Sequence, residues 1–208
     1  MNRMLTLALA GAALAVASPA AAQSFSNNWD SMDFGPAPGF TIIDSYEGWF
    51  YDSGDGSGIE VQFNNVAGTP FSGANFVELD SDANIAMSRA IAQAGTYDFS
   101  FYYSDRPNVA ASSNGLDLML NGASILSVAG GDGAGDTNWT LYTVRFTALA
   151  DSTITFSALG TSDSFGGYID DVALVAVPEP STWAAMILGI GAVGGTLRRR
   201  QAARAALA

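Results

Sequence analysis

Apolar and polar residues alternate with a period of two along much of the segment 23–177. The clearest run is 97–103, in which aromatic residues occupy every second position. Similar runs lie at 59–63, 116–120 and 142–146. Because successive side chains of a strand point to opposite faces, each run predicts a β-strand with one buried face and one wet face.

Segments rich in glycine, aspartate and serine separate these runs and predict turns. They lie at 52–58, 129–138 and 160–167. Asn121-Gly122 stands between two apolar runs, which is a strong signal for a two-residue hairpin. About eight to ten short strands at this spacing, with no convincing helix among them, predict an all-β sandwich. One domain of about 150 residues can bury a sizeable apolar core.

The first 22 residues have the pattern of a secretory signal peptide. Arg3 precedes an uncharged apolar stretch at 4–16. The small residues Ala20 and Ala22 flank the cleavage position that such a peptide needs, so the mature chain is expected to start at Gln23. The alternative is an uncleaved anchor helix, for which the apolar stretch is short.

The segment 178–208 carries a second signal at the other end of the sequence. An uncharged stretch at 182–197 is followed at once by Arg198, Arg199 and Arg200. Its 16 residues are marginal for a bilayer span, which usually takes about 17–25. The basic cluster predicts that the tail remains on the cytoplasmic side. The alternative, a buried core helix, has no reason to end in three adjacent arginines.

The motif that precedes this stretch resembles a known sorting signal. It consists of Pro178, Glu179, Pro180, Trp183 and Ala184. With the apolar helix and the basic tail, it resembles the PEP-CTERM signal in its PEP-x-x-W-A form. The resemblance implies a Gram-negative bacterium that makes exopolysaccharide, and removal of the tail near Pro-Glu-Pro by exosortase. It also implies export by the secretion machinery, an inner-membrane-tethered precursor with a transmembrane helix, and a final place at the cell surface or in the extracellular matrix.

A second resemblance covers roughly Asp33 to Val175, within the domain expected at 23–177. Its blocks are FVELDS (76–81), AGTYDFSFYYSDRP (94–107), NG (114–115), GTSDS (160–164) and GYIDDV (167–172). In this order they resemble the galactose-binding-like jelly roll of secreted bacterial proteins and carbohydrate-binding modules. The resemblance implies two antiparallel sheets, and often one structural calcium ion near the first and last strands. The usual first-strand block is Asn-x-Phe-Glu, whereas this chain has Asp33-Phe34-Gly35 and lacks the glutamate.

Charge and composition exclude several classes of protein. The whole chain carries −12, but the segment 23–177 holds only three arginines against 19 acidic residues, which leaves it at −16. A segment with this negative charge repels the phosphate backbone of nucleic acids, so we expect no nucleic-acid partner. The chain has no histidine and no cysteine. The lack of histidine excludes a Ser-His-Asp triad and a zinc site with imidazole ligands. The lack of cysteine excludes disulfides and a zinc site with thiolate ligands.

Asp170 is the strongest candidate for a metal ligand. A strict alternation of Asp170, Val172 and Leu174 would place this carboxylate on an apolar face, where it is costly unless paired. Calcium prefers oxygen ligands, so Asp170 with Asp171 and Asp33 forms the candidate calcium site, with Glu78 as the alternative partner to Asp33. The alternative is a carboxylate that accepts hydrogen bonds from loop backbone or pairs with arginine.

Aromatic residues and one arginine are the candidates for ligand binding. Trp49 and Tyr51 border the glycine-rich segment 52–58, and Tyr102 lies on the polar face of its strand. Sugar rings stack on exposed aromatic planes, although aromatic residues also build sandwich cores. Arg106 can receive an acidic sugar, stack on Tyr102 or pair with an acid of the protein.

The sequence therefore predicts a non-catalytic exported protein that binds carbohydrate or exopolysaccharide. The alternative is a secreted glycoside hydrolase that uses a carboxylate pair drawn from Glu78, Asp80 and Asp82. No feature of the sequence places two of these acids in one cleft, so we expect no catalytic residues.

Overall fold

The structure is a computed structural model that describes residues 23–178, 184, 187–195, 198 and 205. Its described strands are β1 (Phe25–Asn27), β2 (Gly39–Ile43), β3 (Ser45–Tyr46), β4 (Trp49–Gly54), β5 (Ile59–Phe63), β6 (Asn75–Glu78), β7 (Ile85–Ile91), β8 (Gly95–Ser104), β9 (Gly115–Leu120), β10 (Ala123–Ala129), β11 (Thr140–Ala148), β12 (Ser152–Ala158) and β13 (Tyr168–Val177). A single 3-10 turn, Ala111–Ser113, interrupts them within this range. The runs at 97–103, 59–63, 116–120 and 142–146 all lie in strands, as their alternation predicts.

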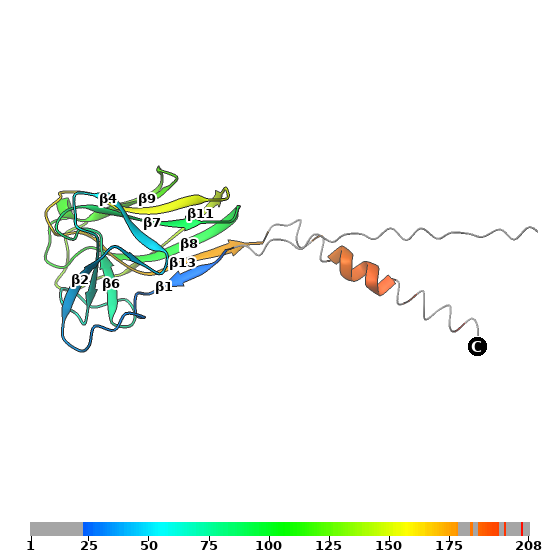
Figure 1. The fold of residues 1–208 in the computed structure, drawn as a ribbon, viewed down its shortest axis with the longest axis horizontal. Helices are drawn as coiled ribbons and strands as arrows, with labels where there is room; N and C mark the ends of the chain where they lie inside the picture. Colours follow the sequence, from blue (N-terminus) through cyan, green and yellow to red (C-terminus); the bar gives the residue numbers. More distant parts are fainter. Residues whose placement is uncertain (1–22, 179–183, 185–186, 196–197, 199–204, 206–208) are drawn as a thin grey trace, which may run out of the picture.

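The strands form two antiparallel sheets that pack face to face (Figure 1). The first sheet has the order β11-β8-β13-β6-β5-β2, with β1 paired to β13. The second has the order β10-β9-β12-β7-β4-β3. From β7 to β13 the chain passes repeatedly from one sheet to the other, as in a jelly roll. The predicted all-β jelly-roll sandwich is confirmed.

The core lies between the inner faces of the two sheets. Tyr97, Phe99 and Phe101 of β8 are fully buried, and the rings of Phe99 and Phe101 lie 5.6 and 4.9 Å from that of Phe156 on the opposite sheet. Trp49 is equally buried at 5.4 Å from Phe156. Burial of this much aromatic surface stabilises the sandwich without any disulfide.

A bulge in β13 changes the face on which Asp170 lies. Asp170 pairs with Tyr102, but the next register pair joins Ala173 to Ser100, so the chain carries one extra residue between them. Asp171 takes that place with a φ of 45°. The parity of the alternation changes at this point. Asp170 therefore points to the outer face with Tyr102, and the predicted face shared with Val172 and Leu174 is wrong.

The two ends of the sandwich differ in what they carry. β1 pairs with the second half of β13, so the chain enters and leaves the domain at one end (Figure 1). The long loops that join β4 to β5, β6 to β7, β8 to β9, β10 to β11 and β12 to β13 gather at the opposite end. Beyond the sandwich, residues 187–195 are helical. Among the described residues, no helix has the length and apolarity needed to cross a bilayer.

Candidate functional site

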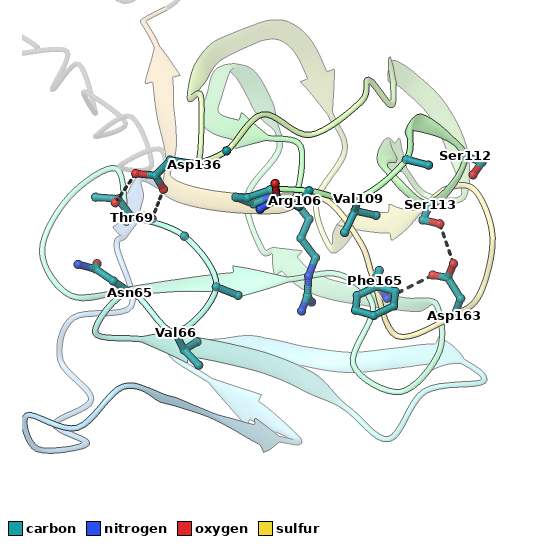
Figure 2. Close-up of a pocket in the computed structure, with 16 residues that line it drawn as sticks. Asn65, Val66, Thr69, Arg106, Val109, Ser112, Ser113, Asp136, Asp163 and Phe165 are labelled. Atoms are coloured by element: carbon teal, nitrogen blue, oxygen red, sulfur yellow. Dashed lines mark hydrogen bonds between the residues drawn. The ribbon is translucent and has the colours of Figure 1, made fainter.

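A pocket of about 830 Å³ opens among the loops at the end of the sandwich opposite to the termini. Four connections supply its walls: those between β5 and β6, β8 and β9, β10 and β11, and β12 and β13. Figure 2 shows Arg106 extending between these walls toward Val66 and Phe165. Because these loops follow strands of both sheets, the sandwich holds the walls in fixed positions.

Arg106 is the central polar side chain of this pocket. Its guanidinium forms an ion pair with Glu78, and 17% of the side chain is exposed. Its Cζ lies 4.7 Å from the ring centre of Phe165 and 5.9 Å from that of Tyr168. The ring of Phe165 is 43% exposed, so it presents an aromatic surface beside a cation that cannot move away.

A buried row of polar side chains supports Arg106 from the outer face of the first sheet. Glu60 on β5 lies opposite Glu78 on β6, and Glu78 lies opposite Tyr168 on β13. Gln62 donates one hydrogen bond to Glu60 at 3.1 Å and another to Glu78. The backbone N–H of Gly166 donates to Glu78 at 2.8 Å. These contacts satisfy a carboxylate that is fully excluded from water.

Burial controls the ionisation of both glutamates. It raises the pKa of Glu78 well above its usual value, although the charge of Arg106 and the Gly166 N–H act in the opposite direction. Burial also raises the pKa of Glu60, against the hydrogen bond from Gln62. Two buried carboxyls thus share one guanidinium. A ligand in the pocket therefore meets much less positive charge at Arg106 than it would meet at an unpaired arginine.

Two pairs of hydrogen-bonded side chains tie the rim of the pocket together (Figure 2). Thr69 donates to Asp136 from its hydroxyl at 2.9 Å and from its backbone N–H at 3.0 Å. The Ser113 hydroxyl donates to Asp163 at 2.7 Å. Both rim carboxylates are exposed. The pocket thus combines an aromatic face, a paired cation and an acidic rim, which suits a polar ligand without negative charge.

Glycines allow the Phe165 loop to lie close to the sheet. A Cβ atom on Gly166 would lie 2.7 Å from the Cβ of Asp80, and one on Gly167 would lie 2.3 Å from the ring of Tyr103. Only glycine fits such contacts, because it has no Cβ atom. The two glycines that follow Phe165 therefore allow this loop to pack directly against the sheet. The 160–167 segment was expected to be a polar turn, and its single aromatic residue was the available signal for the site.

The structure separates the four residues predicted to bind a ligand. Arg106 lies in the pocket, and it pairs with Glu78 and stacks on Phe165 instead of Tyr102. Trp49 is fully buried in the core, so its expected role in an exposed aromatic platform is wrong. The hairpin of β3 and β4 turns Trp49 inward because it lies opposite Arg89, on the inner side of the sheet.

The two predicted tyrosines lie outside the pocket. Tyr51 is half-buried, and its hydroxyl donates to the Gly54 carbonyl at 2.9 Å. Tyr102 does face outward, as expected, but its ring is covered by that of Phe71 with centres 3.5 Å apart. A stacked pair leaves one face of Tyr102 unavailable to a sugar. Tyr102 instead forms part of a shallow groove with Asn28, Glu47 and Asp171.

The three carboxylates proposed for calcium do not come together. Asp170 accepts hydrogen bonds from the backbone N–H groups of Phe71, Ser72 and Asp171 at 3.0, 3.1 and 2.7 Å. The side chain of Asp171 accepts from the Ser72 hydroxyl, and Asp33 accepts from the backbone of Gly35. The described residues contain no group of three histidine, cysteine or acidic side chains suited to a metal ion. These residues therefore do not fit a calcium site, and calcium binding stays a prediction.

The carboxylates considered for hydrolysis also have structural partners. Asp80 is buried and accepts from the backbone N–H groups of Asp163 and Ser164. Asp82 accepts from both the backbone and the hydroxyl of Ser57, which lowers its pKa. Glu78 lies beneath Arg106. These contacts hold the loops at the pocket end of the domain.

Most residues of the two predicted signals fall outside the described part of the chain. This applies to Ala20, Ala22, Glu179, Pro180, Trp183, Arg199 and Arg200. Pro178 is exposed directly after β13, while Ala184 and Arg198 are helical and exposed. Gln23, the expected mature N-terminus, accepts from the backbone N–H of Ala92 at 2.7 Å and donates to the Ala90 carbonyl.

Comparison with known proteins identifies the C-terminal signal and the fold. Residues 176–201 match the PEP-CTERM protein-sorting motif, so the predicted sorting signal is confirmed. No curated protein matches the chain. The K1 cleaved adhesin domain of Lys-gingipain from Porphyromonas gingivalis W83 shares the fold with a TM-score of 0.56 and 12% identity, over 75% of this chain and 99% of that domain. A family 35 carbohydrate-binding module from Clostridium thermocellum aligns with a TM-score of 0.41 and 10% identity, over 75% of this chain and all of the module.

Proposed function

We propose that this protein is exported, tethered through its sorting tail and used at the cell surface or in the extracellular matrix to bind neutral carbohydrate. The PEP-CTERM motif at residues 176–201 supports export and a membrane-anchored precursor. Exosortase is the proposed processing enzyme, and exopolysaccharide of a Gram-negative bacterium is the proposed class of ligand. The binding site is the pocket around Arg106.

The pairing of Arg106 with the exposed Phe165 ring is the observation that carries the binding proposal. The ring offers an apolar plane against which a pyranose can stack, and a fixed guanidinium can donate to sugar hydroxyls. The polar groups needed to orient a ligand are few and lie on rigid walls, as is typical of small-molecule sites. The similar fold of the cleaved adhesin domain of Lys-gingipain agrees with a use at the cell surface.

Charge favours a neutral sugar over an acidic one. Glu78 neutralises Arg106, and Asp136 and Asp163 add negative charge at the rim. The segment 23–177 carries −16 in total. A uronic acid would meet this field unscreened within about 10 Å at 0.1 M salt, whereas a neutral sugar would not.

A glycan array with the purified protein tests the proposal, followed by titration of two matched variants. Phe165→Ala should weaken binding of a neutral glycan by about tenfold, because it removes the ring on which the sugar stacks. Such a contact with an aromatic ring contributes on the order of 1.4 kcal/mol, which corresponds to a factor of about ten in affinity. Phe50→Ala is the control. Phe50 is 39% exposed, close to the 43% of Phe165, but it lies on β4 of the second sheet, outside the pocket. Equal affinities for wild type and Phe165→Ala would exclude this pocket, and loss of binding in Phe50→Ala alone would move the site to the second sheet.

A further inference from the structure

We infer that the end of the sandwich from which the sorting tail departs rests on the surface of the lipid bilayer that holds that tail. This inference rests on the proposed function, because it requires the tethered precursor. The occupant is the phospholipid bilayer itself. Four features of the described residues lead to it: the short tether, the placement of charge, the exposed apolar side chains and the position of the pocket.

The tether keeps this end of the domain close to the membrane. β13 is a central strand of the first sheet and ends at Val177, where it still pairs with Thr96. Only six residues, 178–183, separate it from Ala184, which is helical. Six residues span at most about 20 Å even when fully extended. The domain therefore cannot move more than this distance from the helix that the sorting motif carries.

Charge is distributed very unevenly between the two ends of the sandwich. The five loops at the pocket end, which join β4 to β5, β6 to β7, β8 to β9, β10 to β11 and β12 to β13, contain seven aspartates and one arginine. The three turns at the tail end are 92–94, 121–122 and 149–151, and they contain a single acid, Asp151.

The nearest strand charges at the tail end compensate each other. Asp98, opposite Val175, forms an ion pair with Arg145 at 2.6 Å. Arg89, two residues before the end of β7, lies on the inner side of its sheet, and the charge of the exposed Glu47 in the turn between β3 and β4 acts against its own, so these two add little net charge. The segment 23–177 has a net charge of −16, so anionic lipid headgroups would repel most of its surface. The tail end is the part of the described surface at which this repulsion is smallest.

Exposed apolar side chains occupy the same end. Leu149, at the tip of the hairpin between β11 and β12, is 74% exposed. Val175, near the end of β13, is 55% exposed. Ala92 and Ala150 are exposed in the neighbouring turns. An apolar side chain at a protruding tip gains by entering the headgroup region, and each charge that enters with it reduces this gain. The turn that carries Leu149 contains one acid, Asp151.

A bilayer fits this end better than a protein partner does. The exposed apolar groups are small and lie on separate turns, so they do not form the large hydrophobic patch that a stable protein interface buries. The tether also holds the domain beside the bilayer at a high effective concentration, so even weak contacts are populated. With this end down, the loops that line the pocket around Arg106 lie at the end of the sandwich away from the membrane.

The absence of cysteine allows a direct test. Leu149→Cys and Leu141→Cys are made separately in the full chain and labelled with the same environment-sensitive fluorophore. Leu141 is the matched control, because it is 52% exposed on β11, the strand that leads to Leu149, but lies near the pocket end. The two positions are about 26 Å apart along the strand. Each protein is reconstituted into vesicles of phosphatidylethanolamine and phosphatidylglycerol and recovered by flotation.

We expect the label at position 149 to shift to the blue in vesicles and the label at position 141 to keep its aqueous spectrum. Adding Ala150→Glu to the 149-labelled protein should reduce the shift, because it adds a second acid, next to Asp151, beside the inserted side chain. Flotation without a shift at position 149 would overturn this inference and leave the tether intact. Failure to float would instead overturn the tethered precursor of the proposed function. A shift that depends on protein concentration, and not on lipid, would assign the end to a second copy of the chain.

Discussion

At the scale of single residues, burial decides which aromatic and acidic side chains can meet a ligand. Trp49 and Phe165 both adjoin glycine-rich segments, yet Trp49 is completely buried and Phe165 is 43% exposed. Glu78 is excluded from water while Asp136 lies on the surface. The residue types are visible in the sequence, but their exposure depends on contacts that the fold creates. Side chains in the core therefore affect stability first, and binding only through it.

Trp49→Ala should destabilise the domain by about 3–5 kcal/mol, because it removes a large buried ring and leaves a cavity beside Phe25 and Phe156. Chemical denaturation with the wild type and the variant measures this difference. Phe165→Ala provides the contrast and should change the free energy of unfolding by less than about 1 kcal/mol. Similar stability for wild type and Trp49→Ala would show that this tryptophan does not belong to the core.

Buried carboxyls should make the domain less stable as the pH rises. Burial raises the pKa of Glu60 and Glu78 in the folded protein above the unfolded value of about 4.3. The folded state therefore binds more protons than the unfolded state, and the stabilisation present below that value is lost as the pH rises through the folded pKa. Each unit of elevation corresponds to about 1.4 kcal/mol once the group is fully ionised.

Glu60→Gln isolates one of these groups. The glutamine keeps an oxygen that can accept the hydrogen bond from Gln62, but it does not titrate. The fall in melting temperature between about pH 5 and about pH 8 should be smaller in Glu60→Gln than in the wild type. Asp33→Asn, at an exposed position, serves as the control. The same pH profile in Glu60→Gln and wild type would contradict the prediction.

At the scale of secondary-structure elements, the strands were predictable and the bulge was not. The alternation in 97–103 and 59–63 reflects a sheet with one dry face, so hydrophobicity alone marks β8 and β5. In β13 the same rule fails at Asp170, because Asp171 adds a residue that no alternation reveals. The pocket was equally hidden, since four loops far apart in sequence supply its walls. Among its residues, only Arg106 belonged to the predicted ligand-binding set.

The bulge makes Asp170 an anchor for the loop between β5 and β6. Asp170→Ala removes the acceptor of three backbone N–H groups, and we expect a loss of roughly 2–5 kcal/mol in the free energy of unfolding. Asp33→Ala removes one exposed acceptor and should cost less than about 1 kcal/mol. Thermal melts of both variants measure the contrast. Melts of the wild type with added calcium and with a chelator test the calcium prediction in the same assay.

At the scale of the whole molecule, the domain is polarised from end to end. The two ends of the domain segment, the turns at 92–94, 121–122 and 149–151, and Leu149 lie at one end, and the pocket with its acidic loops lies at the other. The sorting motif at 176–201 overlaps the last residues of β13. Processing near Pro178 would therefore leave the strand complete, so release from the tail should not disturb the fold or the pocket.

Glu179→Ala tests the sorting signal in the source organism. The change removes the acidic residue between Pro178 and Pro180 while the N-terminal signal stays intact. We expect a longer form that remains with the membrane, detected by fractionation and mass spectrometry. Ser181→Ala, at a variable position of the motif, should be processed normally. An unchanged mass and location in Glu179→Ala would contradict processing at this motif.

The position of β13 between β8 and β1 also determines how the domain transmits force. A load applied at Val177 and resisted by a ligand held near Arg106 acts along the length of the strands, because these points lie at opposite ends of the antiparallel β8–β13 pair. Ladder hydrogen bonds run perpendicular to the strands, so this load shears many bonds at once instead of opening them one after another. While its tail is anchored, the domain should therefore resist tension along this axis far better than tension applied across the sheets.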